Sequence, residues 1–274
     1  MGFVGLLLAA VMGNAVVVTP VVNMYSAATE EADVVSQAIF GANVGVLEER
    51  DGWARIQTAD QYTGWVPLAR LVRSQKPYGS TGRVAQVESL FAHLYREPSI
   101  TRHQPLLTVP FQSRLETVGE EEGWLHVRLP DDRSGWVQTG DVTFDSKLAS
   151  VDEMIALAKR FLGLPYTWGG TSSFGFDCSG FTQMLCLRRG YRLPRDARPQ
   201  AEWSGVVPVE KKDLQPGDLL YFAKPPGKKI THTGLYIGNG EFIHATAHEK
   251  PFVQISKLDD EHWTEVFVCE RRLK

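Results

Sequence analysis

Residue types suited to nucleophilic and acid–base chemistry occur in two short motifs of the 274-residue chain. Cys178 lies in FDCSGF, between an aspartate and a Ser-Gly pair, and His232 and His244 lie twelve residues apart in THTGLYIGNGEFIHA. A cysteine can attack an amide carbonyl when a base takes its proton and a third group orients that base. Cys178 is therefore a candidate nucleophile, and His232 and His244 are the candidates for the base and for the group that orients it.

A helical pattern follows the polar approach to Cys178. Apolar residues recur at spacings of three and four between Phe181 and Arg188, and Gly190 is a suitable stop. Asp177 is a good N-cap residue, which would place Cys178 in the first helical turn. Unpaired amides and the positive end of the helix dipole would there lower the pKa of the thiol and could bind an oxyanion.

Two other interpretations of these residues remain open. Cys178 could be a small buried hydrophobic residue, the role that we assign to Cys186 and Cys269. One cysteine and two histidines are also a known set of zinc ligands. No obvious activating carboxylate accompanies them and no Cys-x-x-Cys spacing occurs, so we predict neither a metal nor a cofactor.

The turn between two predicted strands decides whether the histidines share one face of a sheet. The strands flank the Gly-Asn-Gly sequence at 238–240, and each carries one histidine. A two-residue Asn-Gly turn would place His232 and His244 on opposite faces. A three-residue turn pairs Ile237 with Glu241 and places the histidines diagonally on the same face, with a glycine opposite the second one. We predict the three-residue turn.

An internal repeat occupies the first half of the chain. The sequence DGWARIQTADQYTGWV at 51–66 aligns with EGWLHVRLPDDRSGWV at 122–137 at a constant offset of 71 residues. Short alternating runs separated by turns are typical of antiparallel strands. We predict two small all-β barrels, at 15–75 and 80–145, and we interpret the repeated tryptophans as core residues.

A third domain is predicted at 150–274. It begins with SVDEMIALAKRFLG, in which Ser150 and Glu153 form a capping box before a helical run. Residues 1–14 are a leading segment or the remnant of a signal peptide. Their apolar run has the length of a signal-peptide core, but no Lys or Arg occurs before Arg50.

The overall composition limits the classes of partner. The chain is 43% hydrophobic and 22% charged, with a formal net charge of −3. These values are typical of a soluble globular protein and give no reason to expect nucleic acid or an acidic membrane as a partner. We expect a monomer without stable membrane insertion, and we favour a periplasmic or secreted location over a cytoplasmic one.

The motifs of the predicted third domain resemble those of the NlpC/P60 family, papain-like cysteine peptidases that cleave bacterial cell-wall peptides. The matching stretches are PYTWGG, FDCSGF, LPRD, LQPGDLLYF and THTGLYIGNGEFIHA. The repeated Gly-Trp pattern resembles bacterial SH3-like (SH3b) domains, which often bind peptidoglycan or its peptides. The resemblance implies a multi-domain chain with two SH3b barrels followed by an α+β papain-like domain.

The resemblance also implies roles for individual residues. It makes Cys178 the nucleophile, His232 the general base and His244 the residue that orients this base. Tyr166 would lie near the oxyanion, and Asp177 and Ser179 would line the substrate site. Ala197 stands where several family members carry a serine that contacts the substrate, which could loosen that contact.

Two SH3b domains before an NlpC/P60 domain resemble the YkfC-like γ-D-glutamyl-L-diamino acid endopeptidases. In that group the first SH3b domain closes one end of the cleft, so that only murein peptides with a free N-terminal L-Ala fit. The ammonium needs acidic or hydroxyl acceptors, for which Asp177 and Tyr62 are candidates, with Glu30 and Glu31 in range. Alternatives are a wall-binding SH3b protein with weak or no activity, and an amidase or acyltransferase on the same fold.

Overall fold

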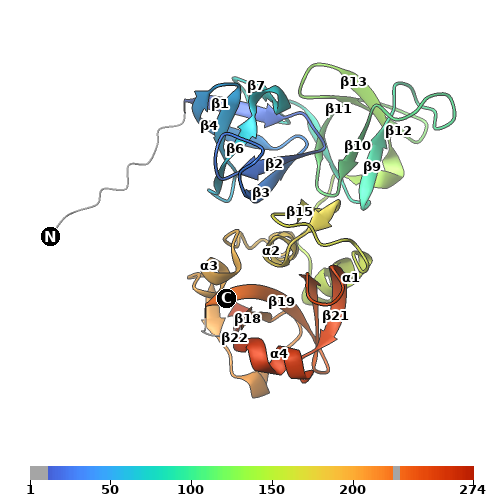
Figure 1. Ribbon diagram of the computed structural model, residues 1–274. Coiled ribbons are helices and arrows are strands. Elements are labelled where there is room, and N and C mark those ends of the chain that lie inside the picture. Colours follow the sequence, from blue (N-terminus) through green and yellow to red (C-terminus); the bar gives the residue numbers. More distant parts are fainter. Residues whose placement is uncertain (1–11, 225–228) are drawn as a thin grey trace.

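Seven antiparallel strands form the first domain of the computed structural model, which describes residues 12–224 and 229–274 (Figure 1). The sheet order is β3-β2-β6-β5-β4-β1-β7. The strands are β1 (Gly13–Val17), β2 (Val21–Tyr25), β3 (Val34–Ile39), β4 (Asn43–Arg50), β5 (Trp53–Gln57), β6 (Thr63–Pro67) and β7 (Leu71–Arg73), with the 3-10 turn η1 (Leu68–Arg70) before the last. Residues 1–11, most of the predicted leading segment 1–14, lie outside the described residues.

The second domain repeats this plan in a five-stranded sheet, β13-β12-β11-β8-β14, and a two-stranded sheet, β10-β9. Its elements are β8 (Arg83–Val87), β9 (Phe91–Leu94), β10 (Leu107–Pro110), β11 (Arg114–Glu121), β12 (Trp124–Arg128), β13 (Ser134–Gln138), η2 (Thr139–Asp141) and β14 (Val142–Thr143). Strands β11, β12 and β13 begin and end 71 residues after β4, β5 and β6. The predicted repeat is therefore confirmed strand by strand.

The repeated tryptophans differ from the prediction that all are core residues. Trp65 is buried, with 7% of its surface exposed, whereas Trp53, Trp124 and Trp136 are only half-buried. Trp53 and Trp124 open the strands that follow tight turns, so one side of each ring remains open to solvent. Both rings pack edge-on against a tyrosine of the same barrel.

Over its described residues, the third domain has a six-stranded sheet, β17-β22-β18-β19-β20-β21, a two-stranded sheet, β15-β16, and four short helices. Its elements are α1 (Val151–Arg160), β15 (Thr171–Ser172), β16 (Gly175–Phe176), α2 (Cys178–Arg188), α3 (Ala197–Ala201), β17 (Val206–Pro208), η3 (Lys211–Asp213), β18 (Leu219–Ala223), β19 (Ile230–Gly238), β20 (Glu241–Thr246), β21 (Phe252–Lys257), α4 (Glu261–Val266) and β22 (Phe267–Leu273). The predicted capping box of Ser150 and Glu153 starts α1. The predicted order of two all-β domains and one α+β domain is confirmed.

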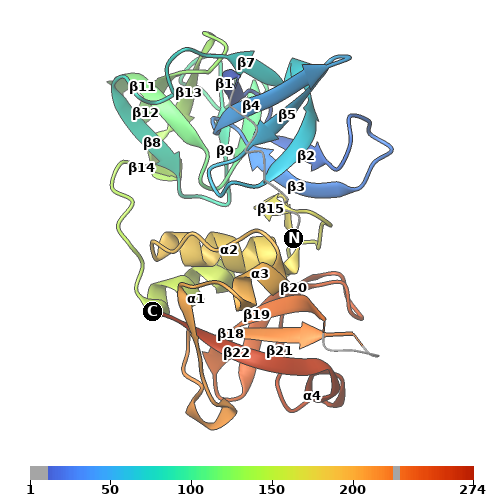
Figure 2. The same ribbon diagram turned by 90° about the vertical axis from the view of Figure 1, so that its left-hand side faces the viewer.

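Alternate residues of the central strands supply two apolar layers. Leu219, Leu235 and Ile243 belong to the cluster that includes α1 and α2, whereas Leu220 and Phe242 belong to the cluster that includes α4. Figure 2 shows α1, α2 and α3 between this sheet and the two barrels, with α4 on the opposite side. The helix that carries Cys178 therefore lies next to the barrels.

Candidate active site

Cys178 occupies the first position of α2, as the sequence predicts. Asp177 is the N-cap, and its Oδ1 accepts a hydrogen bond from the amide of Gly180 at 2.7 Å. A carboxylate at this position satisfies one of the amides that a helix start leaves unpaired. Cys178 itself retains only 8% of its surface exposed.

The thiol of Cys178 lies against the strand that carries His232. Its Sγ donates to the carbonyl of Thr231 at 3.9 Å. Burial, and next the charge of Asp177, raise the pKa of Cys178 to about 12, although the amide of Thr233 acts in the opposite direction. The predicted lowering of the thiol pKa is therefore wrong for the unliganded protein, because desolvation outweighs the helix start. The resting thiol is neutral.

The hairpin of β19 and β20 turns differently from the prediction. Asn239 and Gly240, with φ of 54° and 75°, form a two-residue turn that pairs Gly238 with Glu241. Positive φ at both central residues is the geometry that Asn-Gly favours in hairpins. The predicted three-residue turn is therefore wrong.

A β-bulge at Ile237 nevertheless places both histidines on one face. The register shifts between Tyr236 and the turn, so that Tyr236 pairs with Phe242. A two-residue turn alone would place His232 and His244 on opposite faces of the sheet. The extra residue in β19 moves His232 to the face that carries His244. The predicted shared face is confirmed, because Nε2 of His232 lies 2.7 Å from Nδ1 of His244.

Gly234, opposite His244, leaves the space that the two imidazole rings need. A Cβ at Gly234 would lie 2.7 Å from Cδ2 of Phe242 and 3.1 Å from Cβ of His244. The first distance is shorter than carbon contacts allow, so a side chain at this position would displace the ring beside the histidines. The predicted need for space opposite His244 is confirmed.

Ser256 extends the histidine pair into a chain of three side chains. Nε2 of His244 lies 3.0 Å from Oγ of Ser256 on β21. If His244 donates to Ser256, its Nδ1 accepts from Nε2–H of His232, which leaves Nδ1 of His232 without a proton. Ser256 does not belong to the predicted site, because the register of β21 against β20 cannot be deduced from the residues.

Both histidines are neutral in the unliganded protein. Burial lowers the pKa of His232 to about 3 and that of His244 well below its ordinary value of 6.5, and neighbouring histidines act in the same direction. A neutral imidazole is the form that can accept a proton from a thiol.

These low pKa values predict a loss of stability in mild acid. Below pH 6.5 the unfolded chain takes up protons that the folded protein excludes, so the free energy of unfolding falls as the pH drops towards 3. Each buried histidine can lower the free energy of unfolding by up to about 1.4 kcal/mol per pH unit between pH 6.5 and pH 3. The melting temperature should decline between pH 7 and pH 5. His244→Asn should flatten that decline, whereas His103→Asn, at an exposed histidine, should not.

Tyr166 lies close to the thiol, as the family resemblance implies. Its amide donates to Pro251 at 2.8 Å, and its backbone bridges to Phe176, two residues before Cys178. Burial, and next the neighbouring Cys178, raises the pKa of its hydroxyl. The hydroxyl therefore stays protonated and able to donate.

Asp177 and Ser179 meet at a residue to which the sequence analysis gave no role. Arg195 donates to Oδ1 and Oδ2 of Asp177 at 3.0 and 2.6 Å and to Oγ of Ser179 at 2.9 Å. Its Nε donates to Oγ of Ser36, on β3 of the first barrel, at 3.0 Å. Arg195 is only 2% exposed, so this guanidinium joins the barrel to the start of α2 inside the protein.

Tyr62 reaches the same region from the first barrel. Its hydroxyl donates to Oδ2 of Asp196 at 3.2 Å, and burial, followed by the charge of Asp196, raises the pKa of this hydroxyl to about 12. The neighbouring Asp60 accepts from Nε2 of Gln183, on α2, at 2.9 Å. The structure thus brings Tyr62, one of the two candidate ammonium acceptors, to Asp196 of the catalytic domain.

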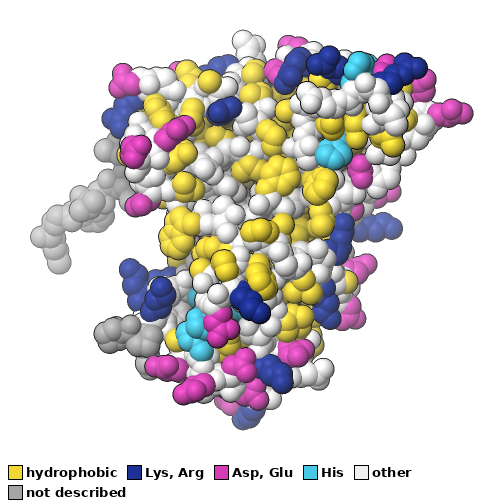
Figure 3. Space-filling view, turned by 45° about the vertical axis from the view of Figure 1, so that its right-hand side comes forward, with side chains coloured by type: hydrophobic (Ala, Val, Ile, Leu, Met, Phe, Trp, Pro, Cys, Tyr) yellow, Lys and Arg dark blue, Asp and Glu magenta, His cyan; other side chains and the backbone are white. Residues whose placement is uncertain are grey.

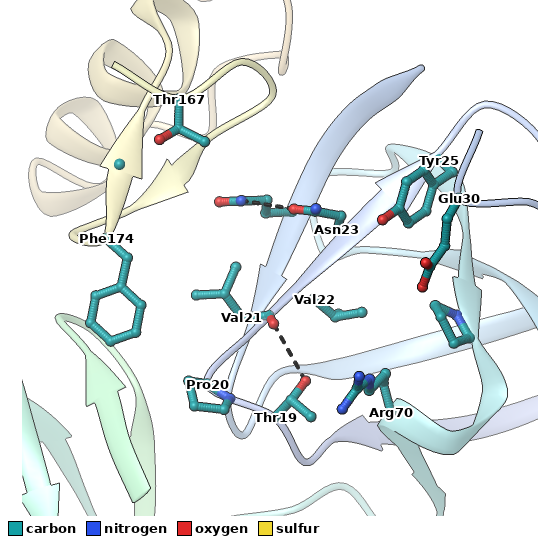
Figure 4. Close-up of a pocket in the computed structure, with 13 residues that line it drawn as sticks. Thr19, Pro20, Val21, Val22, Asn23, Tyr25, Glu30, Arg70, Thr167 and Phe174 are labelled. Atoms are coloured by element: carbon teal, nitrogen blue, oxygen red, sulfur yellow. Dashed lines mark hydrogen bonds between the residues drawn. The ribbon is translucent and has the colours of Figure 1, made fainter. Parts of the chain in front are cut away.

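A cavity of about 420 Å³ lies between the first barrel and the loop before α2 (Figure 4). Glu30 and Arg70 line it from the barrel, and Thr167 and Phe174 line it from the catalytic domain. Glu30, one of the two glutamates considered for the substrate ammonium, therefore faces this cavity.

The described residues show neither a metal centre nor a membrane-spanning helix. Within 12–224 and 229–274 no three His, Cys, Asp or Glu side chains gather as metal ligands would. Over the same residues no helix has the length and apolar character needed to cross a bilayer.

Three family models match successive parts of the chain. The model described as "NlpC/P60 family" matches residues 163–272, "Bacterial dipeptidyl-peptidase Sh3 domain" matches 24–71 and "YKFC SH3b2 domain" matches 87–144. A Bacillus cereus protein named gamma-D-glutamyl-L-lysine dipeptidyl-peptidase is 35% identical over 252 residues, which cover 86% of this chain and 74% of the relative. The chain belongs to the NlpC/P60 family.

Other relatives extend this likeness over all three domains. The Bacillus subtilis protein of the same name is 32% identical, covering 77% of this chain and 72% of its own length. The crystal structure of an NlpC/P60 family protein from Bacillus cereus superimposes with a TM-score of 0.83 at 30% identity, covering 95% of this chain and 99% of that one. This NlpC/P60 protein is a cysteine peptidase with two preceding SH3b domains, as the resemblance implied.

Proposed function

We propose that this NlpC/P60 peptidase hydrolyses the γ-D-glutamyl-diamino acid bond of cell-wall peptides. Cys178 is the nucleophile, His232 the general base and His244 the orienting residue. The 2.7 Å contact between the two imidazoles, beside a thiol at a helix start, carries the proposal. The printed names of the two Bacillus relatives support the choice of bond.

The geometry suits a two-step acyl transfer to water. The thiol turns from the carbonyl of Thr231 and passes its proton to Nδ1 of His232, while sulfur attacks the amide carbonyl. The C–N bond then breaks, and the imidazolium returns the proton to the leaving amine. Water hydrolyses the thioester with His232 again acting as base. His244, held by Ser256, keeps His232 in the tautomer that this transfer needs.

A charged pair is easier to form here than either single ion. Burial opposes a lone thiolate and a lone imidazolium, as the raised pKa of Cys178 and the lowered pKa of His232 indicate. Proton transfer within the pair creates both charges side by side, where each stabilises the other. The neutral resting state is therefore compatible with a thiolate during turnover.

Asp196 and Tyr62 are the acceptors that we propose for a free N-terminal ammonium of L-Ala. Asp177 already binds Arg195 through both oxygens, which leaves it little capacity for a further donor. Asp196 is exposed and accepts from the hydroxyl of Tyr62, so a carboxylate and a phenol oxygen meet where the first barrel faces the catalytic domain.

A pair of peptides tests this selectivity. L-Ala-γ-D-Glu-diaminopimelate with a free amine should be cleaved at least about tenfold faster, in kcat/KM, than its N-acetylated form, because acetylation removes the charge that Asp196 would bind. Asp196→Asn should bring the kcat/KM values of the two peptides closer together. Mass spectrometry of the products measures both rates and locates the broken bond.

Three results would contradict parts of the proposal. Equal cleavage of both peptides would reject the ammonium site but retain the peptidase. Transfer of the acyl group to an acceptor other than water would indicate an acyltransferase. Absence of any turnover would favour a wall-binding protein.

A further inference from the structure

Trp263, on helix α4, packs against both histidines of the proposed triad. Its ring lies nearly parallel to that of His232, with centroids 5.4 Å apart and planes at 27°. It meets His244 edge to face, at 4.7 Å and 80°. The indole therefore contacts both partners of the 2.7 Å hydrogen bond.

Two further histidines flank the indole. His248 and His262 stack face to face, with centroids 3.7 Å apart and planes at 6°. Both rings lie at 80° to the Trp263 ring. The His248 side chain is 38% exposed, whereas Trp263 as a residue is 6% exposed. Figure 3 shows histidine side chains at the surface of the C-terminal domain, beside acidic and basic ones.

We propose that Trp263 is a positioning residue, which holds His232 in the plane that His244 requires and keeps water from their hydrogen bond. This inference rests on the proposed function. Phe222 and Phe242, on strands of the sheet, pack against the indole at centroid distances of 5.2 and 5.3 Å. An indole fixed on these sides leaves the imidazole of His232 little freedom to tilt.

The same contact favours the charged form that His232 takes during turnover. Indole is the aromatic face that attracts a cation most strongly. Against it act the buried surroundings and the nearby imidazoles of His248 and His262. Cys178 supplies the opposite charge once its proton has moved. Trp263 therefore favours the imidazolium without admitting the water that would compete for its hydrogen bond.

Substitution of Trp263 in the full-length protein tests this role. Trp263→Ala should lower kcat on the free-amine peptide by roughly tenfold or more and leave KM within about twofold. Without Trp263, water should enter beside His232 and relieve the burial that lowers its pKa. Because burial is the largest cause of that shift, its relief should outweigh the lost indole face, so the pKa of His232 should rise towards 6.5 and the acid limb of the activity profile should move up with it. Trp263→Phe should retain most of the rate. If the alanine variant does not fold, Trp263→Leu replaces it.

Val266→Ala is the matched control. Val266 is buried on the same helix and in the same apolar cluster, so its loss should lower the melting temperature without moving the pH profile. The inference fails if both variants lose rate in proportion to stability, or if NMR titration of isotope-labelled histidines finds the same pKa for His232 with and without Trp263. That titration needs no turnover, so it decides the question even if the wild-type protein cleaves nothing.

Discussion

Cys178→Ala should abolish hydrolysis of the free-amine peptide, with a fall of at least about ten-thousandfold in kcat. No other described side chain at the start of α2 can form the acyl intermediate, since Ser179 is bound to Arg195. The melting temperature should change by only about 2 °C, because the variant replaces a neutral, nearly buried thiol with a methyl group of similar polarity. Product formation by mass spectrometry and thermal unfolding measure the two effects.

Cys186→Ala is the control for this experiment. Cys186 is fully buried in the core of the same helix, so its truncation should cost stability and leave the rate nearly unchanged. A Cys178→Ala variant that loses stability as Cys186→Ala does, yet still hydrolyses peptide, would show that Cys178 is a packing residue. The nucleophile would then have to be sought elsewhere.

Arg195→Met should reduce the free energy of unfolding by about 3–5 kcal/mol. The guanidinium is almost fully buried and binds Asp177 through two hydrogen bonds. Its removal leaves a carboxylate that is also buried without its counter-charge, and breaks the link to Ser36 in the first barrel. Denaturant unfolding measures the loss, provided that all domains unfold in one transition.

Two further variants isolate the cause of that loss. Arg198→Met breaks an exposed ion pair with Glu202, four residues later at the end of α3, and should cost less than about 1 kcal/mol. Adding Asp177→Asn to Arg195→Met removes the uncompensated charge while keeping an N-cap side chain, so stability should partly return. If the double variant is no more stable than Arg195→Met, the buried charge is not the main cost.

Most of the fold could be predicted from sequence patterns that span only a few residues. The Gly-Trp repeat located corresponding strands in both barrels, because each strand begins beside a turn whose residues are visible in the sequence. The N-cap at Asp177 and the capping box at Ser150 likewise depend on neighbours within three residues. Interactions of that range can be deduced without knowing the tertiary structure.

The missed features depend on residues distant in sequence. The bulge at Ile237 inserts one residue into a ladder without any glycine or proline at the bulged position. Arg195 acquires its importance from Ser36, 159 residues earlier, and Ser256 from the register of a third strand. The low pKa of His232 arises from burial that only the packed domain creates, and the same burial overturned the expected acidity of Cys178.

The hydrogen bond between Asp60 and Gln183 attaches the first barrel to the helix that begins with Cys178. Arg195 anchors the same barrel to the residue before that cysteine. These hydrogen bonds hold the first barrel beside the start of α2. We therefore expect the proposed peptidase to cleave short, released murein peptides faster than intact peptidoglycan, because the barrel stays beside the sulfur.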